Sequence, residues 1–395
     1  MMRDRDGAGG ADKAARVLVY VPHGDIPDRR GFSPSIVACE FARRTSAYAP
    51  WLVCSAEGTP VGCTEWEHLP LRRLGPRRLY RRLRKLGIRV PGRTLAPDFL
   101  KACRSIRPAL LHIHQLEFDL GEMARRYGAF PPVVLHAHVL SQKPCSVRGL
   151  AHHYIAVSDY VANGLADMGY PAERITTIRN GVDTNLFIAP QPAQVAAAKE
   201  RLGVSQDTPV LAFVGRKHDV KGYPAFLQVA QRLLLEDRRV LVLAVGADPE
   251  RPSGEPRYAA ARTRERGLAA DPRFRSIPAL PHPDLAALYQ AIDVTLMPSL
   301  AEPQGMAMIE SLAAGCITIS SRVGGIGETI EDGVTGFLVD DPRDVDLLYA
   351  RTAYVLDNLE ALAPLRRAAR SYAVQNLDWS ISARRLEVLY QHLLA

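Results

Sequence analysis

Cysteine, lysine and long apolar runs are all scarce in this chain of 395 residues. Its six cysteines are scattered, at positions 39, 54, 63, 103, 145 and 316, and no two have the two-residue gap of a zinc or redox motif. The scattered positions favour free or buried thiols in a reducing compartment over a disulfide framework.

No apolar run approaches the ~20 residues that a membrane-spanning helix needs. Residues 1–15 are charged and rich in glycine and alanine, without the apolar core of a secretory signal. We therefore expect a cytoplasmic protein whose first 15 residues are disordered.

Lysine contributes few of the positive charges. The 50 cationic residues outnumber the 42 acidic ones and give a net charge of +8, but arginine dominates the cationic set. Together with abundant alanine, proline and glycine, this bias is typical of a GC-rich bacterial genome. The excess favours anionic partners such as nucleotide sugars, phospholipid surfaces or nucleic acid, without choosing among them.

Short apolar runs alternate with helical patterns along the first half of the chain. Strands are predicted at residues 17–21, 51–54, 110–114, 133–138, 154–158 and 175–178, with a helix at 35–44. Alternation of this kind predicts a parallel sheet with helices on both faces.

The pattern breaks near residue 188 and then restarts. Strands are predicted at 210–214, 240–245, 294–297, 317–320 and 336–339, and helices at 223–235, 285–291 and 306–314. The sequence thus predicts an α/β protein of two doubly wound, Rossmann-like domains, at residues 16–187 and 188–372, that face a central cleft. A last helix, within 373–395, is expected to pack back toward the first domain. Ligands of such sheets bind at the carboxyl ends of the strands.

Two glutamates flank the predicted start of the helix at 306–314. Glu302 precedes it and Glu310 lies inside it, while Gly305 allows a ligand to approach backbone N–H groups where the helix dipole favours an anion. A carboxylate such as Glu310 accepts well from adjacent hydroxyls. The pair alone is equally compatible with an ordinary helix that carries an exposed glutamate.

Other residues at strand ends strengthen this interpretation. Arg216 and Lys221 straddle the turn after the strand at 210–214, where two cations can hold a diphosphate. Gly324 and Gly325 follow a later strand and permit close approach of a phosphate or sugar.

Taken in order, these motifs resemble glycosyltransferase family 4, a large family of retaining GT-B enzymes. The resemblance covers most of the chain. Its signals are Gly31, His138, Ile155–Ser158, Arg179–Asp183, Val214–Arg216 with Lys221–Gly222, Pro298–Ser299, Glu302–Glu310, Gly324–Gly325 and Gly333–Val339.

The resemblance implies a role for each site residue. Arg216 and Lys221, after Gly215, would hold the donor diphosphate, and Glu310 would accept from the ribose hydroxyls. Glu302 would contact the transferred sugar. The remaining expected contacts are Gly31 with the diphosphate from across the cleft, His138 with the reacting centre, backbone near Leu280 with the base, and backbone of Gly305, Met306 and Ala307 with sugar and phosphate.

The implied reaction moves a hexose or N-acetylhexosamine from a nucleotide diphosphate sugar, UDP-linked before GDP-linked, to an acceptor hydroxyl. Configuration is retained by same-face substitution, and no metal or other cofactor is required. The acceptor stays open among a natural product (as in antibiotic biosynthesis), a polysaccharide and a lipid. A catalytically silent nucleotide-sugar binding protein and a peripheral membrane enzyme are the alternatives.

The sequence departs from the family at three positions. Gln304 stands where phenylalanine is frequent, Ile317 where proline is frequent, and Phe32 where a second glycine often follows Gly31. None of the changes removes a charged donor-binding group. We expect Gln304 to influence the choice of donor.

Histidines occur in two pairs with strand spacing, His112 with His114 and His136 with His138. Each pair should share one strand face, which suggests a metal site. Since neither pair has cysteine or carboxylate partners at known metal spacing, we expect no metal and polar side chains that line the cleft.

A basic run extends from Arg72 to Arg93. It fits a solvated helix face or, less well, an amphipathic surface in weak contact with anionic lipid. Nothing else in the chain resembles a base-reading module, so no nucleic-acid partner is expected.

Overall fold

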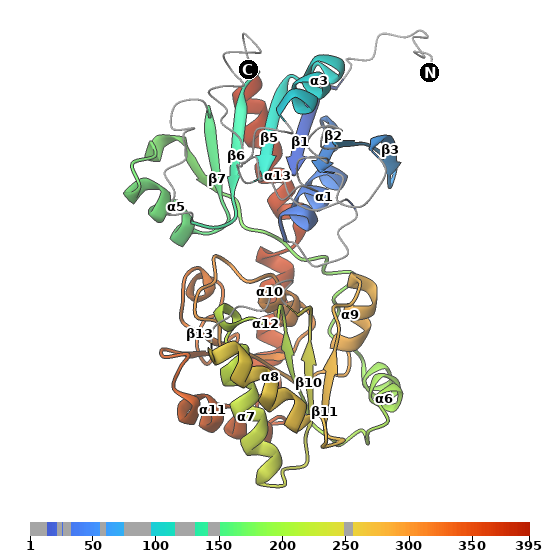
Figure 1. Cartoon of the computed structure of the whole chain (residues 1–395), viewed down its shortest axis with the longest axis vertical. Helices are drawn as coiled ribbons and strands as arrows, with labels where there is room; N and C mark the ends of the chain where they lie inside the picture. The colour runs from blue at the N-terminus through green and yellow to red at the C-terminus, as the bar shows by residue number, and fades with distance from the viewer. Residues whose placement is uncertain are drawn as a thin grey trace, which may run out of the picture.

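Two parallel β-sheets, one in each half of the chain, organise the structure (Figure 1). This computed structural model describes residues 14–21, 26, 33–55, 61–74, 96–114, 131–140, 151–248 and 256–395. Most strands of each sheet, and all of the central ones, are apolar and buried on both faces, as expected where helices cover both sides.

The first sheet has eight strands in the order β3-β4-β2-β1-β5-β6-β7-β8, parallel except for the β3–β4 pair. Its strands are β1 (Arg16–Val21), β2 (Ala49–Ser55), β3 (Gly62–Trp66), β4 (Leu69–Leu74), β5 (Leu110–His114), β6 (Val133–Ala137), β7 (His153–Ala156) and β8 (Ile175–Thr177). Its helices are α1 (Ser33–Arg44), α3 (Ala96–Ile106), α5 (Asp159–Asp167) and the short 3-10 helix η1 (Ala172–Arg174).

The second sheet is entirely parallel, in the order β11-β10-β9-β12-β13-β14. Its strands are β9 (Val210–Val214), β10 (Leu241–Val245), β11 (Phe274–Ile277), β12 (Val294–Met297), β13 (Ile317–Ser321) and β14 (Phe337–Val339). The order reverses between β9 and β12, and the crevice at such a reversal is where α/β sheets bind ligands.

Helices fill the connections of the second half. They are α6 (Pro192–Arg201), η2 (Asp219–Lys221), α7 (Tyr223–Leu235), α8 (Pro256–Leu268), α9 (His282–Tyr289), α10 (Met306–Ala313), η3 (Ile326–Glu328), α11 (Val345–Asp357) and α12 (Ala363–Asn376). Separate apolar clusters lie on the two faces of this sheet.

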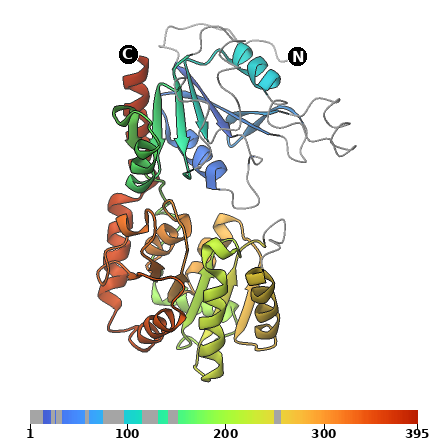
Figure 2. The same ribbon diagram turned by 60° about the vertical axis from the view of Figure 1, so that its left-hand side comes forward.

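The last helix, α13 (Trp379–Leu394), returns to the first sheet and packs against α1. Figure 2 shows α12 and α13 running along one side of both halves. Trp379 is buried and meets Phe41 edge-on, with ring centroids 5.5 Å apart. The returning helix thus completes the apolar cluster on one face of the first sheet.

The predicted strands are all present, while β3, β4, β11, α3 and α8 were not predicted. The strand expected to reach Ser158 ends at Ala156, because the Ser158 hydroxyl caps α5 by accepting from Val161 N. The division at residues 187 and 372 stays a prediction. Among the described helices, none is both long enough and apolar enough to cross a membrane.

Candidate active site

The loops after β9 and β12 meet where the strand order of the second sheet reverses. After β9 the chain passes Arg216, makes the turn η2 and enters α7 through Gly222, whose φ of 70° is left-handed. Backbone of the two loops is joined by Leu300 N, which donates to Val220 O at 2.8 Å. Lys221 Nζ donates to a carboxylate oxygen of Glu302. The structure therefore brings together a cation and a carboxylate that lie 81 residues apart in sequence.

Helix α10 opens beside this pair. Gly305 is its N-cap, with a φ of 91°, and supplies no side chain to the first turn. Met306 and Ala307 begin the helix, so their N–H groups have no partner within it and lie at the positive end of the helix dipole. Tyr289 supports this turn by donating its hydroxyl to Ala307 O at 3.0 Å. The helix start can therefore bind an anion next to Lys221.

Glu310 lies inside α10 and is buried, with 5% of its surface exposed. Burial raises the pKa of Glu310 to about 8. His282, at the start of α9, places Nε2 3.6 Å from Glu310 Oε1, and Leu280 is half-buried two residues before it. His282 was not predicted, because a lone histidine behind a proline carries no local signal. Glu310 is thus a sheltered acceptor, not the exposed carboxylate of an ordinary helix.

Gly324 and Gly325 make a close approach to protein backbone. A Cβ on Gly324 would lie 2.0 Å from Glu302 O, and one on Gly325 would lie 2.1 Å from Pro303 O. Gly325 N also donates to Glu302 O at 3.0 Å. The contact shown by the structure is therefore with the Glu302 loop, which the glycine pair holds in place.

Gln304 is buried and bonds the backbone of the first half of the chain, while its influence on the choice of donor stays a prediction. The residue is 2% exposed, and both the oxygen and the nitrogen of its side-chain amide bond the backbone of Asn180. Gln304 Oε1 accepts from Asn180 N at 2.7 Å, and Nε2 donates to Asn180 O at 2.9 Å. Because Asn180 follows β8, Gln304 ties the donor-side loop to the first half of the chain.

Replacing Gln304 with Glu should destabilise this junction. The new carboxylate would face Asn180 O, which leaves a buried charge unpaired and a donor lost. We expect the free energy of unfolding to fall by about 3 kcal/mol in urea denaturation. Gln375→Glu, on the exposed side of α12, is the matched control. Equal stability of the two variants would contradict the assigned contact.

A second junction joins the halves at α5 and was not predicted. Glu328, in the loop after β13, accepts from the backbone N–H groups of Asp159 and Tyr160 at 2.9 and 2.6 Å. Arg179 donates to Glu328 and Asp159 at 2.9 and 2.7 Å. Loops that follow strands of both sheets therefore meet here, as they do at Gln304.

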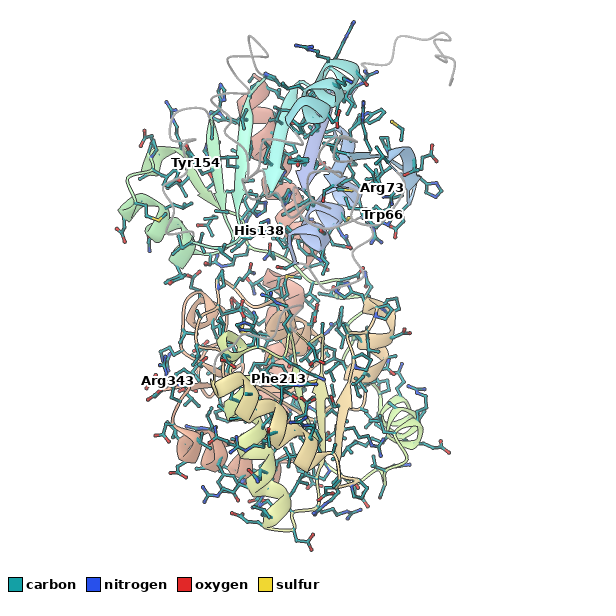
Figure 3. All side chains as sticks on the ribbon, in the orientation of Figure 1. Trp66, Arg73, His138, Tyr154, Phe213 and Arg343 are labelled. Carbon is teal, nitrogen blue, oxygen red and sulfur yellow. The ribbon has the colours of Figure 1, made fainter. Side chains whose placement is uncertain are left out.

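His138 follows β6, and Figure 3 shows it at the end of the first half that faces the second. It is 5% exposed, and its Nε2 lies 2.9 Å from His114 Nδ1. His112, His114 and His136 are at most 1% exposed, so they do not line a cleft, which corrects that expectation. Burial lowers the pKa of His138 to about 3.

Two predicted features fall wholly or partly outside the described residues. Gly31 lies outside them. The basic run is described only to residue 74, on the strand β4 and not on a helix. There Arg72 donates to Ser105 Oγ at 3.1 Å and Arg73 to Thr64 Oγ1 at 2.7 Å. The side chains of Arg72 and Arg73 therefore form hydrogen bonds with neighbouring side chains of the same domain.

Comparisons with known families cover both halves of the chain. Residues 28–186 match Glycosyltransferase Family 4, and residues 194–373 match Glycosyl transferases group 1. The chain belongs to glycosyltransferase family 4. This confirms the resemblance inferred from the ordered motifs.

Curated relatives are about one third identical to this chain over the regions that match. A D-inositol 3-phosphate glycosyltransferase from Thermobispora bispora is 36% identical over 230 residues, which are 57% of this chain and 52% of the relative. One from Streptosporangium roseum is 32% identical over 266 residues, 66% of this chain and 59% of the relative. The chain thus matches little more than half the length of these relatives.

Solved structures are similar to this chain over nearly its whole length. Sucrose-phosphate synthase from Thermosynechococcus elongatus superposes with a TM-score of 0.77 at 21% identity, covering 96% of this chain and 99% of that one. Anabaena HepE in complex with UDP and glucose gives 0.76 at 18% identity, covering 95% and 99%. At such identities the likeness shows the fold, and it confirms GT-B.

Proposed function

We propose that this protein is a retaining glycosyltransferase that moves a hexose or N-acetylhexosamine from a nucleotide diphosphate sugar to an acceptor hydroxyl. One observation carries the proposal. Lys221 pairs with Glu302 just before α10, and Glu310 lies buried within α10, at the reversal point of the second sheet. This set offers a cation to the diphosphate of a nucleotide sugar, a polar acceptor to its sugar and a buried carboxylate to its ribose.

In the proposed complex, Arg216 and Lys221 hold the diphosphate together with the N–H groups of Met306 and Ala307. Arg216 is exposed and available at the edge of the crevice. Lys221 is paired with Glu302 before the donor arrives, so each group exchanges a protein partner for a donor group. Glu310 would accept from the ribose hydroxyls, with the base near the Leu280 backbone.

The chemical step breaks the bond between the sugar and the β-phosphate oxygen, on which negative charge develops. Lys221 and the helix N–H groups would stabilise that charge in place. In same-face substitution the leaving phosphate takes the proton of the acceptor hydroxyl as the new bond forms. No enzyme nucleophile is needed, and His138 would orient groups at the reacting centre.

The comparisons support a choice of donor and of first acceptor. Similar structures contain UDP, UDP with glucose, or UDP-glucose, so we propose a UDP-sugar before a GDP-sugar. The relatives named for D-inositol 3-phosphate make a cyclitol the first acceptor to test. A role in natural-product biosynthesis belongs to the same proposal.

Incubation with UDP-glucose, UDP-N-acetylglucosamine and GDP-mannose tests this function. Each donor is offered with and without cyclitol, glycan and lipid acceptors, and release of nucleoside diphosphate is followed with product mass. Turnover of at least one donor is expected, with retained anomeric configuration in the product. Tight nucleotide binding without turnover of any pair would contradict the enzyme and favour a silent binding protein.

The raised pKa of Glu310, about 8, makes UDP affinity depend on pH. The ionised carboxylate accepts both ribose hydroxyls, and at pH 7 only about a tenth of the free protein carries it. UDP affinity should therefore rise about tenfold from pH 7 to pH 9, measured by calorimetry. Glu310→Gln removes this titration, and the same slope in that variant would contradict the role of Glu310.

A further inference from the structure

Four histidines from two neighbouring strands form one buried stack beneath the end of the first sheet. His112 and His114 belong to β5, and His136 and His138 belong to β6 or follow it. The parallel register sets His114 beside His136. Ring centroids of successive members lie 4.4 to 5.3 Å apart. The sheet order, and not the sequence, therefore joins the two pairs into one cluster.

The outer ring nitrogens of this stack are engaged by neighbours. His112 Nδ1 lies 2.5 Å from the hydroxyl of Tyr390, on α13, and His114 Nδ1 lies 2.9 Å from His138 Nε2. These contacts fix the two rings and orient their Nε2 atoms. His114 Nε2 and His136 Nε2, both buried, have no hydrogen-bond partner within the described part of the chain.

One nitrogen from each of His112, His114 and His136 lies within 4.8 Å of the other two. A tetrahedral zinc ion with Zn–N bonds of ~2.0–2.1 Å needs its ligand nitrogens about 3.4 Å apart. His112 Nε2 and His136 Nδ1, separated by 3.2 Å, already meet that spacing. The limit of 4.8 Å means that the rings must turn before all three nitrogens reach that spacing.

We propose that His112, His114 and His136 bind one divalent transition-metal ion, with Zn²⁺ preferred. Three imidazoles are a known zinc ligand set that leaves a fourth position for water. Among the described residues, this set of three histidines includes no carboxylate. Mg²⁺ and Ca²⁺ prefer oxygen ligands, so the set disfavours both ions. Tyr390 and His138 take the outer hydrogen bonds of His112 and His114, as is common for ligating histidines, whereas Nε2 of His136 has no partner among the described residues.

The ion would join β5, β6 and, through Tyr390, α13. The site adjoins the proposed reaction centre, because His138 contacts the ligand His114.

Zinc binding to the untagged full chain tests the site. After chelation and dialysis, titration against a chromophoric zinc chelator should show one equivalent bound per chain, and the apparent melting temperature should rise. His136→Gln keeps the side-chain size and should lower zinc affinity by more than the ~10–100-fold that outer-shell changes cause. Tyr390→Phe should fall inside that range. His392→Ala, at the exposed end of α13, is the matched control and should bind as the parent does.

If His136→Gln fails to fold, X-ray absorption on the zinc-loaded parent protein identifies the metal ligands without the variant. Scattering from three imidazole nitrogens at ~2.0–2.1 Å is expected. The proposal is overturned by a parent protein that binds no stoichiometric zinc, by a zinc shell without imidazole, or by folded His136→Gln with unchanged affinity.

Discussion

Lys221→Ala is expected to lower turnover about 100- to 1000-fold, with a much smaller effect on UDP affinity. The ammonium group acts where charge develops on the leaving phosphate. Its loss therefore destabilises the transition state more than the bound donor. Steady-state kinetics with the best donor and acceptor pair measures the effect. A turnover within a few-fold of the parent would remove Lys221 from the reaction.

Controls must separate this loss from a loss of folding. Lys221 pairs with Glu302, which is largely buried, so Lys221→Ala alone leaves a carboxylate without its partner. Adding Glu302→Gln removes that charge and should restore stability, and its turnover is compared with that of Glu302→Gln alone, because Glu302 also contacts the transferred sugar in the proposed complex. Lys221→Arg keeps the charge at a different reach and should retain more turnover than Lys221→Ala. Recovery of activity in the double variant would show that Lys221 acts only by neutralising Glu302.

Gly324→Ala is expected to displace Glu302 and to lower both stability and turnover. The residue has a φ of 55°, and a Cβ there would lie 2.0 Å from Glu302 O. Left-handed backbone costs roughly 1–2 kcal/mol in alanine, and the overlap adds to it. We expect turnover to fall up to about 100-fold, as when reacting groups move by about 1 Å.

Gly333→Ala is the matched control for backbone strain. Its φ is 76°, and nothing lies within 4 Å of its Cβ position, so it carries the same strain without the overlap. Unfolding and kinetics of both variants should show a similar strain cost but a loss of turnover only at Gly324. Equal turnover in the two would mean that the Gly324 contact does not position Glu302.

Strands with unbroken apolar runs could be predicted from sequence, and their order along the chain predicted the two-sheet architecture. The runs at β1, β9 and β10 are buried along almost their whole length, which is the condition for an unbroken apolar pattern. Strands β3 and β11 escaped because they are short, partly exposed and carry charged residues. In such edge strands, exposed polar residues interrupt the apolar pattern by which a strand is predicted from sequence.

Site residues could be placed by motif order, but their partners could not. The Gln304–Asn180 contact spans 124 residues, and no local pattern connects a glutamine before a helix to a backbone after β8. The four histidines show the same limit. Their i, i+2 spacing predicts a shared face within each strand, whereas the β5–β6 register that joins them is a property of the assembled sheet.

A crystal structure of the full chain with UDP tests the central claim most directly, because it locates the nucleotide without reference to any acceptor. The diphosphate should lie within hydrogen-bonding distance of Lys221 Nζ and the first N–H groups of α10, and the ribose hydroxyls should contact Glu310. UDP bound away from the β9–β12 reversal, with Lys221 still paired to Glu302, would contradict the account.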